Sequence, residues 1–144
     1  MRSATRSSER DRRLIVLDAS AAIEMLLVGP AAATVAAQLL GERVRVPAHF
    51  DAEVLSTLGK ELRSGRIDGE QARVALFHVR GMRAERIALT PLLAEAFALR
   101  DRFGGYDAFY AIVARLSAAT LVTSDRGLAR AAVGYCEVEY VAPR

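Results

Sequence analysis

The feature that most constrains this chain is an unbroken apolar run, LIVL at residues 14–17, that is followed at once by Asp18. Four consecutive apolar residues are typical of a strand buried on both faces, as in a parallel sheet that is covered by helices. Aspartate, by contrast, is a poor strand former and is almost never buried without a partner. The stretch TLVTSD (residues 120–125) repeats the pattern and ends in Asp125. The sequence therefore predicts two buried strands that each lead into a carboxylate.

Hydrophobic periodicity predicts that helices and short strands alternate along the rest of the chain. We expect helices over residues 20–28, 31–40, 49–64, 69–80, 91–103 and 126–132, a strongly apolar helix after Gly104-Gly105, and further strands over 43–47, 86–90 and 136–141. Asp68 is placed to cap the helix over 69–80. Strands that alternate with helices imply a mostly parallel sheet covered on both faces. The predicted fold class is α/β, with a central sheet flanked by helices as an α/β/α sandwich.

Composition limits the class of protein. A chain of 144 residues with 52% hydrophobic residues suits one domain with a sizeable core. It contains no apolar run of about 18 residues and no secretory signal, so we expect a cytoplasmic protein that does not enter a membrane. Its single cysteine, Cys136, excludes an internal disulfide and a cysteine-based zinc site.

The net charge of +3 lies in the first thirteen residues, which hold five arginines against Glu9 and Asp11. The rest of the chain is neutral, so the net charge alone does not indicate a nucleic-acid-binding protein. This polar, charged composition predicts a disordered basic leader over residues 1–13. The folded domain is expected over residues 14–144.

Further acidic residues are placed where they can join the two strand-end carboxylates. In open α/β sheets, ligands bind outside the carboxyl ends of the strands, where Asp18 and Asp125 are expected. Glu53 lies on the flank of the apolar stripe of the 49–64 helix, and Asp107 begins a helix after the two glycines. Each also has a plain structural interpretation, because Asp18 and Asp107 can cap helices, Asp125 can belong to a turn and Glu53 can be solvated.

A cluster of carboxylates has a definite chemistry. Two such groups about 4 Å apart repel by about 1 kcal/mol in water and about 4 kcal/mol at an effective dielectric constant of 20, so the cluster must protonate or hold a cation. Oxygen ligands without cysteine or paired histidines suit Mg²⁺, with Mn²⁺ as a substitute, rather than zinc. Metal-assisted phosphodiester hydrolysis uses such a site. Ser20 and Thr123 are placed to hydrogen-bond the carboxylates, although they can equally be ordinary cap and turn hydroxyls.

Four motifs together resemble a known family. They are IVLDASAAI near the start, VPAHFDAEVLSTL in the middle, and YDAFYAIVARLSAATLVTSD and RGLARAA near the end. In this order and spacing they resemble a PIN domain and, more narrowly, the VapC toxins of bacterial type II toxin–antitoxin pairs. The resemblance extends from Leu14 to Val141. The leader lies outside it and is atypical, because the first strand of such toxins usually lies close to the N-terminus.

The resemblance implies a function and its residues. It implies a Mg²⁺-dependent endoribonuclease that cleaves RNA, often tRNA or ribosomal RNA, and so inhibits translation. It also implies a homodimer and a cognate VapB-like antitoxin whose C-terminal segment blocks the active site, in a heterotetramer or larger assembly. The residues implied as the metal-binding and catalytic quartet, with their polar support, are Asp18, Glu53, Asp107 and Asp125, with Ser20 and Thr123. Asp51, two residues before Glu53, is a rival ligand by proximity.

Two other functions are alternatives to this one. The first is a catalytically silent PIN-like interaction module whose acids only bind a basic partner peptide. The second is a receiver-type phosphoacceptor domain, which also has a strand-end aspartate. A receiver needs a lysine near that aspartate, whereas the only lysine of this chain, Lys60, lies in a helix away from it.

Overall fold

The computed structural model describes residues 13–27, 32–39 and 42–143, so the leader expected over 1–13 lies outside the described residues except for Arg13. Its centre is one sheet of five parallel strands in the order β3-β2-β1-β4-β5. The strands are β1 (Leu14–Leu17), β2 (Arg43–Pro47), β3 (Ala84–Ile87), β4 (Thr120–Thr123) and β5 (Glu137–Tyr140). The predicted α/β class with a parallel sheet is therefore confirmed.

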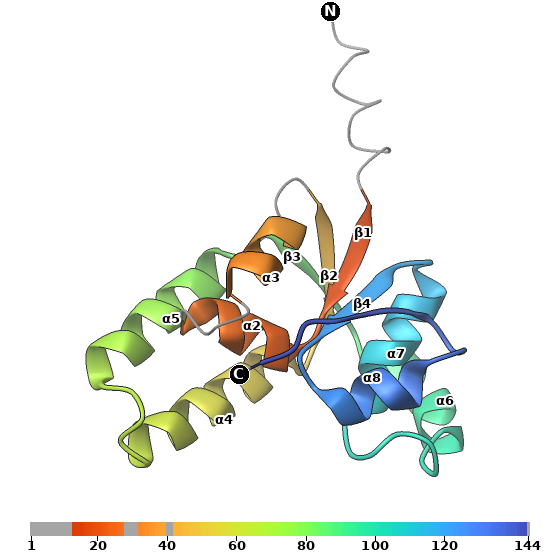
Figure 1. The fold of residues 1–144 in the computed structure, drawn as a ribbon. Coiled ribbons are helices and arrows are strands. Elements are labelled where there is room, and N and C mark those ends of the chain that lie inside the picture. Colours follow the sequence, from red (N-terminus) through yellow and green to blue (C-terminus); the bar gives the residue numbers. More distant parts are fainter. Residues whose placement is uncertain (1–12, 28–31, 40–41, 144) are drawn as a thin grey trace, which may run out of the picture.

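Helices cover both faces of this sheet (Figure 1). One side carries α2 (Ala19–Leu26), α3 (Ala32–Leu39), α4 (Phe50–Arg63) and α5 (Gly69–Gly81). The other side carries α6 (Leu93–Ala98), which follows the 3₁₀ turn η1 (Thr90–Leu92), together with α7 (Asp107–Leu116) and α8 (Arg126–Ala132). Among the described residues, no helix has the length and apolar character needed to cross a membrane.

The core explains the apolar stretches that lead into Asp18 and Asp125. Ile15, Val16 and Leu17 of β1 are fully buried, as are Leu121 and Val122 of β4. In α7, every residue over 108–114 is buried, because this helix packs across the centre of the sheet. A strand that is covered on both faces needs apolar side chains in succession, which is why these strands show no alternation.

Two elements differ from the sequence-based expectation. The strand expected over 86–90 lies over Ala84–Ile87, where it pairs with Val44–Pro47 of β2. The helix expected over 91–103 is shorter and ends at Ala98. Beyond it, the Arg102 guanidinium donates to the carbonyl oxygens of Ala131 and Val133, both at 2.8 Å, so the chain is held in a turn against the end of α8.

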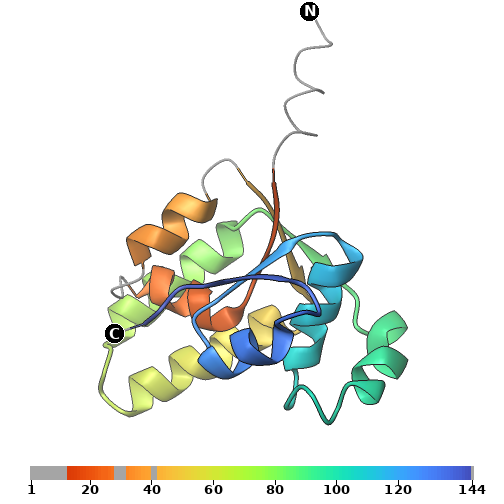
Figure 2. The same ribbon diagram turned by 45° about the vertical axis from the view of Figure 1, so that its right-hand side comes forward.

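The order of the strands fixes where a ligand site can form. From β1 the chain crosses to β2 on one side, while β4 pairs with β1 on the other side. Ligands of open α/β sheets bind at such a switch point, outside the carboxyl ends of the strands. Both views of the ribbon place α2, α4, α7 and α8 around this lower end of the sheet (Figures 1 and 2).

Candidate active site

Asp18 lies at the switch point, directly after β1. Its backbone N–H donates to the Val122 carbonyl oxygen of β4 at 3.0 Å, and the residue is only 4% exposed. One carboxylate oxygen, Oδ2, accepts hydrogen bonds from Ser20 Oγ at 2.5 Å and from Thr123 Oγ1 at 2.7 Å. Asp18 stands at the N-cap position of α2, but its side chain makes no capping hydrogen bond. The two hydroxyls therefore fix a buried carboxylate that does not serve as a cap.

Asp125 follows β4 and caps the next helix. It is the N-cap of α8, since its Oδ1 accepts a hydrogen bond from the Leu128 N–H at 3.0 Å. Its own N–H donates to Thr123 Oγ1 at 3.0 Å, so the strand-end threonine joins both aspartates. Oδ2 of Asp125 has no hydrogen-bond partner among the described residues, which leaves one oxygen for a ligand.

Asp107 and Glu53 are brought to the same place by two helices. Asp107 is the first residue of α7 and is half-buried, with Tyr106 at the N-cap position, so Asp107 is not a cap. Glu53 lies in the first turn of α4 and is half-buried as well. Its Oε1 lies 2.6 Å from Nε2 of His49, one helical turn earlier.

The electrostatics show that these four carboxyl groups share one region. Burial raises the pKa of Asp18, and the charges of Glu53 and Asp125 raise it further, while the hydrogen bonds from Ser20 and Thr123 lower it. The pKa of Asp107 is raised to about 6, first by burial and then by the charges of Asp18, Asp125 and Glu53. His49 opposes that rise. The structure thus brings together all four acids that the sequence singles out.

Their chemistry fits a divalent cation. All the donors are oxygens, and within the described part of the chain no Lys or Arg side chain forms an ion pair with Asp18, Asp107, Asp125 or Glu53. Hard oxygen donors with excess negative charge suit Mg²⁺ or Mn²⁺. Among the described residues, no three His, Cys, Asp or Glu side chains are grouped as a metal site in this conformation.

Asp51, the alternative ligand, pairs with an arginine outside the acid cluster. Its two carboxylate oxygens accept hydrogen bonds from Nε and Nη2 of Arg86, both at 2.8 Å. Asp51 is exposed, and this pairing raises the pKa of the Arg86 guanidinium. Asp51 therefore faces β3 rather than the acid cluster.

Sequence reasoning missed one residue of the site, Tyr110. It follows Asp107 by one helical turn and is fully buried, yet its hydroxyl makes no well-aligned hydrogen bond in the described residues. Burial raises its pKa, and so do the nearby charges of Asp18 and Glu53. The signal was the three-residue spacing after Asp107, which places both side chains on one face of a helix. The Tyr110 ring also lies edge-on to His49, at a centroid distance of 5.1 Å.

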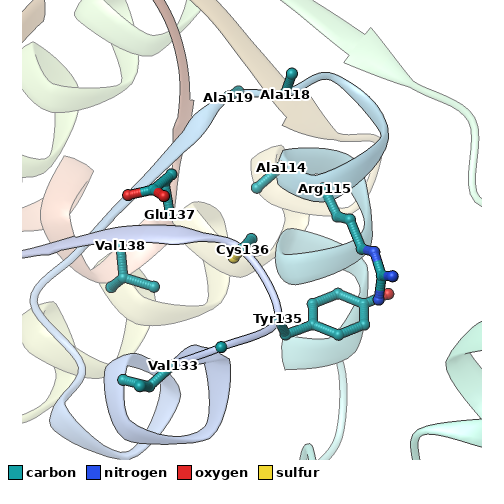
Figure 3. Close-up of a pocket in the computed structure, with 10 residues that line it drawn as sticks. Ala114, Arg115, Ala118, Ala119, Val133, Tyr135, Cys136, Glu137 and Val138 are labelled. Atoms are coloured by element: carbon teal, nitrogen blue, oxygen red, sulfur yellow. The ribbon is translucent and has the colours of Figure 1, made fainter.

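Two cavities of the described structure lie at different distances from these acids. One of about 480 Å³ is lined by His49, Glu53 and neighbouring residues of α4, and so adjoins the cluster. The larger one, about 590 Å³, lies between the end of α7 and β5 and contains none of the four acids (Figure 3). Within it the Arg115 guanidinium stacks 4.7 Å from the centre of the Tyr135 ring. Of these two cavities, the one beside Glu53 therefore adjoins the carboxylates.

Comparisons with known proteins show the family to which the chain belongs. Residues 15–134 match the PIN domain family. Ribonuclease VapC12 of Mycobacterium tuberculosis is 36% identical over 129 residues, covering 90% of this chain and 100% of that protein. Ribonuclease VapC3 of the same organism is 38% identical over 118 residues, covering 81% and 86%. The crystal structure of PAE2754 from Pyrobaculum aerophilum has a TM-score of 0.65 and 28% identity, covering 83% of this chain and 84% of that one. The chain thus belongs to the PIN-domain family, in the group that contains the VapC ribonucleases.

Proposed function

We propose that this protein is a Mg²⁺-dependent endoribonuclease toxin of a VapBC-type toxin–antitoxin pair. The observation that carries the proposal is the electrostatic coupling among Asp18, Glu53, Asp107 and Asp125. Two of these acids follow strands β1 and β4, and the other two lie in the first turns of α4 and α7. The relatives that are named ribonucleases support the same activity. The substrate class is RNA, with tRNA or ribosomal RNA as the expected targets and inhibition of translation as the result.

Each acid has a role that follows from its surroundings. Asp18 is the fixed ligand, because Ser20 and Thr123 hold its Oδ2 and leave Oδ1 without a hydrogen-bond partner among the described residues. Asp107 and Glu53 lie at the starts of helices and are half-buried, so they can turn toward the substrate. A bound divalent ion supplies an activated water and neutralises charge on the phosphate.

The aromatic side chains around His49 strengthen this site. Its ring is contacted by the rings of Tyr106, Phe109 and Tyr110, at centroid distances of 5.4, 5.4 and 5.1 Å. The His49 side chain is only 11% exposed among these rings, and charges interact more strongly where water is excluded. His49 also keeps Glu53 near the cluster through the 2.6 Å contact with its carboxylate.

Protein partners are part of the proposal. The excess negative charge of the cluster suits a basic side chain of a VapB-like antitoxin, which would block the site. Exposed apolar side chains, among them Phe77 at 72% and Phe97 at 69%, are of the kind that protein interfaces cover. We propose a homodimer that binds the antitoxin as a heterotetramer or larger assembly.

Purified protein and RNA test the activity directly. RNA is incubated with the wild type in Mg²⁺ and in EDTA, and with Asp18→Asn, Asp107→Asn and the control Asp101→Asn, whose side chain is exposed. We expect cleavage by the wild type and Asp101→Asn in Mg²⁺ only, and loss of cleavage in both cluster variants. Undiminished cleavage by both cluster variants contradicts the assignment, and no turnover by the wild type at any Mg²⁺ concentration favours the silent interaction module.

The cellular target needs a second experiment. New RNA ends are mapped after brief induction of the wild type and of Asp107→Asn. We expect ends that appear only with the wild type and fall in tRNA or ribosomal RNA. Co-expression of the antitoxin should restore growth and remove these ends.

A further inference from the structure

The cavity of about 480 Å³ beside the carboxylates is lined partly by residues to which the proposed reaction gives no role. It is formed by His49, Glu53, Ser56, Thr57, Lys60 and Tyr106, among others. Its volume lies in the range of small-ligand sites, about 300 to 1,000 Å³, so it suits one nucleotide rather than a duplex. Resting on the ribonuclease function proposed above, we infer that this cavity binds one unpaired nucleotide of the RNA beside the scissile phosphate, with its base stacked on Tyr106 and its phosphate held by Lys60.

The α4 helix connects this cavity with the acid cluster. Ser56, Thr57 and Lys60 follow Glu53 by three, four and seven residues, so all four lie on one face of the helix. With a rise of 1.5 Å per residue, Lys60 lies about 10 Å along the helix axis from Glu53. An RNA strand whose scissile phosphate lies at the carboxylates therefore reaches Lys60 when it runs along α4.

Tyr106 supplies an aromatic platform at the other wall. It immediately precedes Asp107 and is 64% exposed, so its ring is accessible to a ligand. The ring is positioned against His49, with centroids 5.4 Å apart and a tilt of 50°. RNA-binding proteins recognise unpaired bases by stacking them on aromatic side chains of this kind. Because Tyr106 adjoins Asp107 in the chain, a base stacked there belongs to a nucleotide close to the cleaved bond.

The polar groups of the cavity are free to bind a phosphate or a ribose hydroxyl. Lys60 is exposed and forms no ion pair within the described part of the chain, whereas Arg66 and Arg73 are paired with glutamates. The hydroxyls of Ser56 and Thr57 likewise make no hydrogen bond to another described residue. A lysine, two hydroxyls and an aromatic ring together match a nucleotide.

Binding of RNA tests the role of Tyr106 without requiring turnover. The probe is a short fluorescein-labelled single-stranded oligoribonucleotide of mixed sequence, and its anisotropy is measured in Mg²⁺ with the Asp107→Asn protein, which is expected not to consume it. Adding Tyr106→Ala should weaken binding about tenfold, the typical effect of losing one base stack. Tyr106→Phe keeps the ring and should bind like its parent. The control is Leu116→Ala, which removes an apolar side chain that is 68% exposed at the end of α7 farthest from Asp107 and should change nothing.

The salt dependence of the same binding tests Lys60. Loss of one phosphate contact should make the slope of log K against log salt shallower by about 0.7, the value for single strands. We expect this from Lys60→Ala but not from Lys60→Arg. Arg83→Ala is the control, because Arg83 is exposed and precedes β3, at the opposite end of the sheet from the site.

The outcomes separate this inference from the function on which it rests. If the wild type cleaves RNA but Tyr106→Ala and Lys60→Ala bind the oligonucleotide like their parent, the subsite is refuted and the nuclease stands. If these variants keep RNA affinity but lose affinity for a synthetic arginine-rich peptide, the cavity binds protein and the inference is also overturned. If the wild type cleaves no RNA, the proposed function fails first.

Discussion

At the end of β4, the fully buried side chain of Thr123 forms hydrogen bonds with both strand-end aspartates. Its hydroxyl donates to Asp18 Oδ2 at 2.7 Å and accepts from the Asp125 N–H at 3.0 Å. Valine has the same shape but offers neither hydrogen bond, so the buried Asp18 carboxylate keeps only the hydrogen bond from Ser20 and the Asp125 amide loses its acceptor. We expect Thr123→Val to lower the free energy of unfolding by about 2 kcal/mol, measured by urea denaturation.

The control for this change lies on the same strand. Thr120 is half-buried at the start of β4 and its hydroxyl makes no hydrogen bond to another described residue. Thr120→Val should alter the free energy of unfolding by less than about 0.5 kcal/mol. Equal losses in the two variants would mean that strand packing, not the hydrogen bonds to the aspartates, sets the effect.

Asp107 should make the stability of the metal-free protein depend on pH. Its pKa is raised from 3.8 to about 6 in the folded state, so between these values the folded protein holds a proton that the unfolded chain has released. The free energy of unfolding therefore falls as the pH rises from about 4 to 6 and stays lower above that range. Solvent screening of a half-exposed carboxyl leaves on the order of 1 kcal/mol of this effect.

Asp107→Asn removes the ionisable group, and with it the loss of stability that occurs as the pH rises from about 4 to 6. In EDTA at pH 7 its melting temperature should exceed that of the wild type by about 3 °C, and the difference should vanish below pH 4. Asp51→Asn breaks the pairing with Arg86 instead, so it should not raise the melting temperature. A wild type whose melting temperature stays constant from pH 4 to 6 in EDTA would argue against the raised pKa of Asp107.

A site residue could be predicted from the sequence where local secondary structure fixes its position. It could not be predicted where contacts between distant segments do. Asp18 and Asp125 are predictable because a strand end fixes their position, and Glu53 and Asp107 because helix periodicity does. That Asp51 pairs with Arg86 could not be predicted, since the two lie 35 residues apart and meet only when β3 pairs with β2. The unpartnered hydroxyl of Tyr110 is likewise a product of tertiary packing.

Among the helices, α5 has the clearest local start signal. The Asp68 carboxylate accepts from the Gln71 N–H at 2.8 Å, and the Gln71 side chain accepts from the Asp68 N–H at 2.9 Å, which completes a capping box. Asp68→Ala should lower the free energy of unfolding by about 1 kcal/mol in urea, whereas Asp68→Asn keeps an acceptor and should cost only a few tenths. A loss of the same size in both would show that charge at the helix start, not capping, is responsible.

The elements that sequence reasoning misplaced depend on contacts with distant segments. The pattern of RIALT (residues 86–90) predicts a strand, yet β2 pairs with residues 84–87. The Leu92 N–H donates to the Leu89 carbonyl oxygen instead, which closes a 3₁₀ turn in which Leu92 is buried. After α6, the Arg102 hydrogen bonds to residues 131 and 133 end a helix that local propensity would extend. In both cases pairing across the fold outweighs the local pattern.

For the molecule as a whole, the acid cluster joins parts of the chain that are far apart. Asp18 follows β1, Glu53 lies on α4, Asp107 begins α7 and Asp125 caps α8, so a shared cation would link both helical layers to the sheet. A ligand that binds only the folded state stabilises it by about 2.7 kcal/mol at one hundred times its dissociation constant. We therefore expect Mg²⁺ to raise the melting temperature of the wild type at pH 7, and to do so in proportion to the logarithm of its concentration above saturation.

Variants distinguish this effect from a general response to salt. Asp18→Asn and Asp125→Asn should lose most of the Mg²⁺ shift, because each removes a charge from the cluster, whereas Asp101→Asn removes an exposed charge elsewhere and should keep the shift. The shift should also shrink below pH 6, because protons then compete with the ion for Asp107, whose pKa is about 6. The shift in melting temperature with Ca²⁺ at equal concentration tests how closely the carboxylates fit the smaller Mg²⁺, since Ca²⁺ accepts looser geometry at longer distances. If the wild type and the cluster variants respond to Mg²⁺ alike, the four carboxylates do not form a shared metal site, and RNA cleavage by this protein would need another centre.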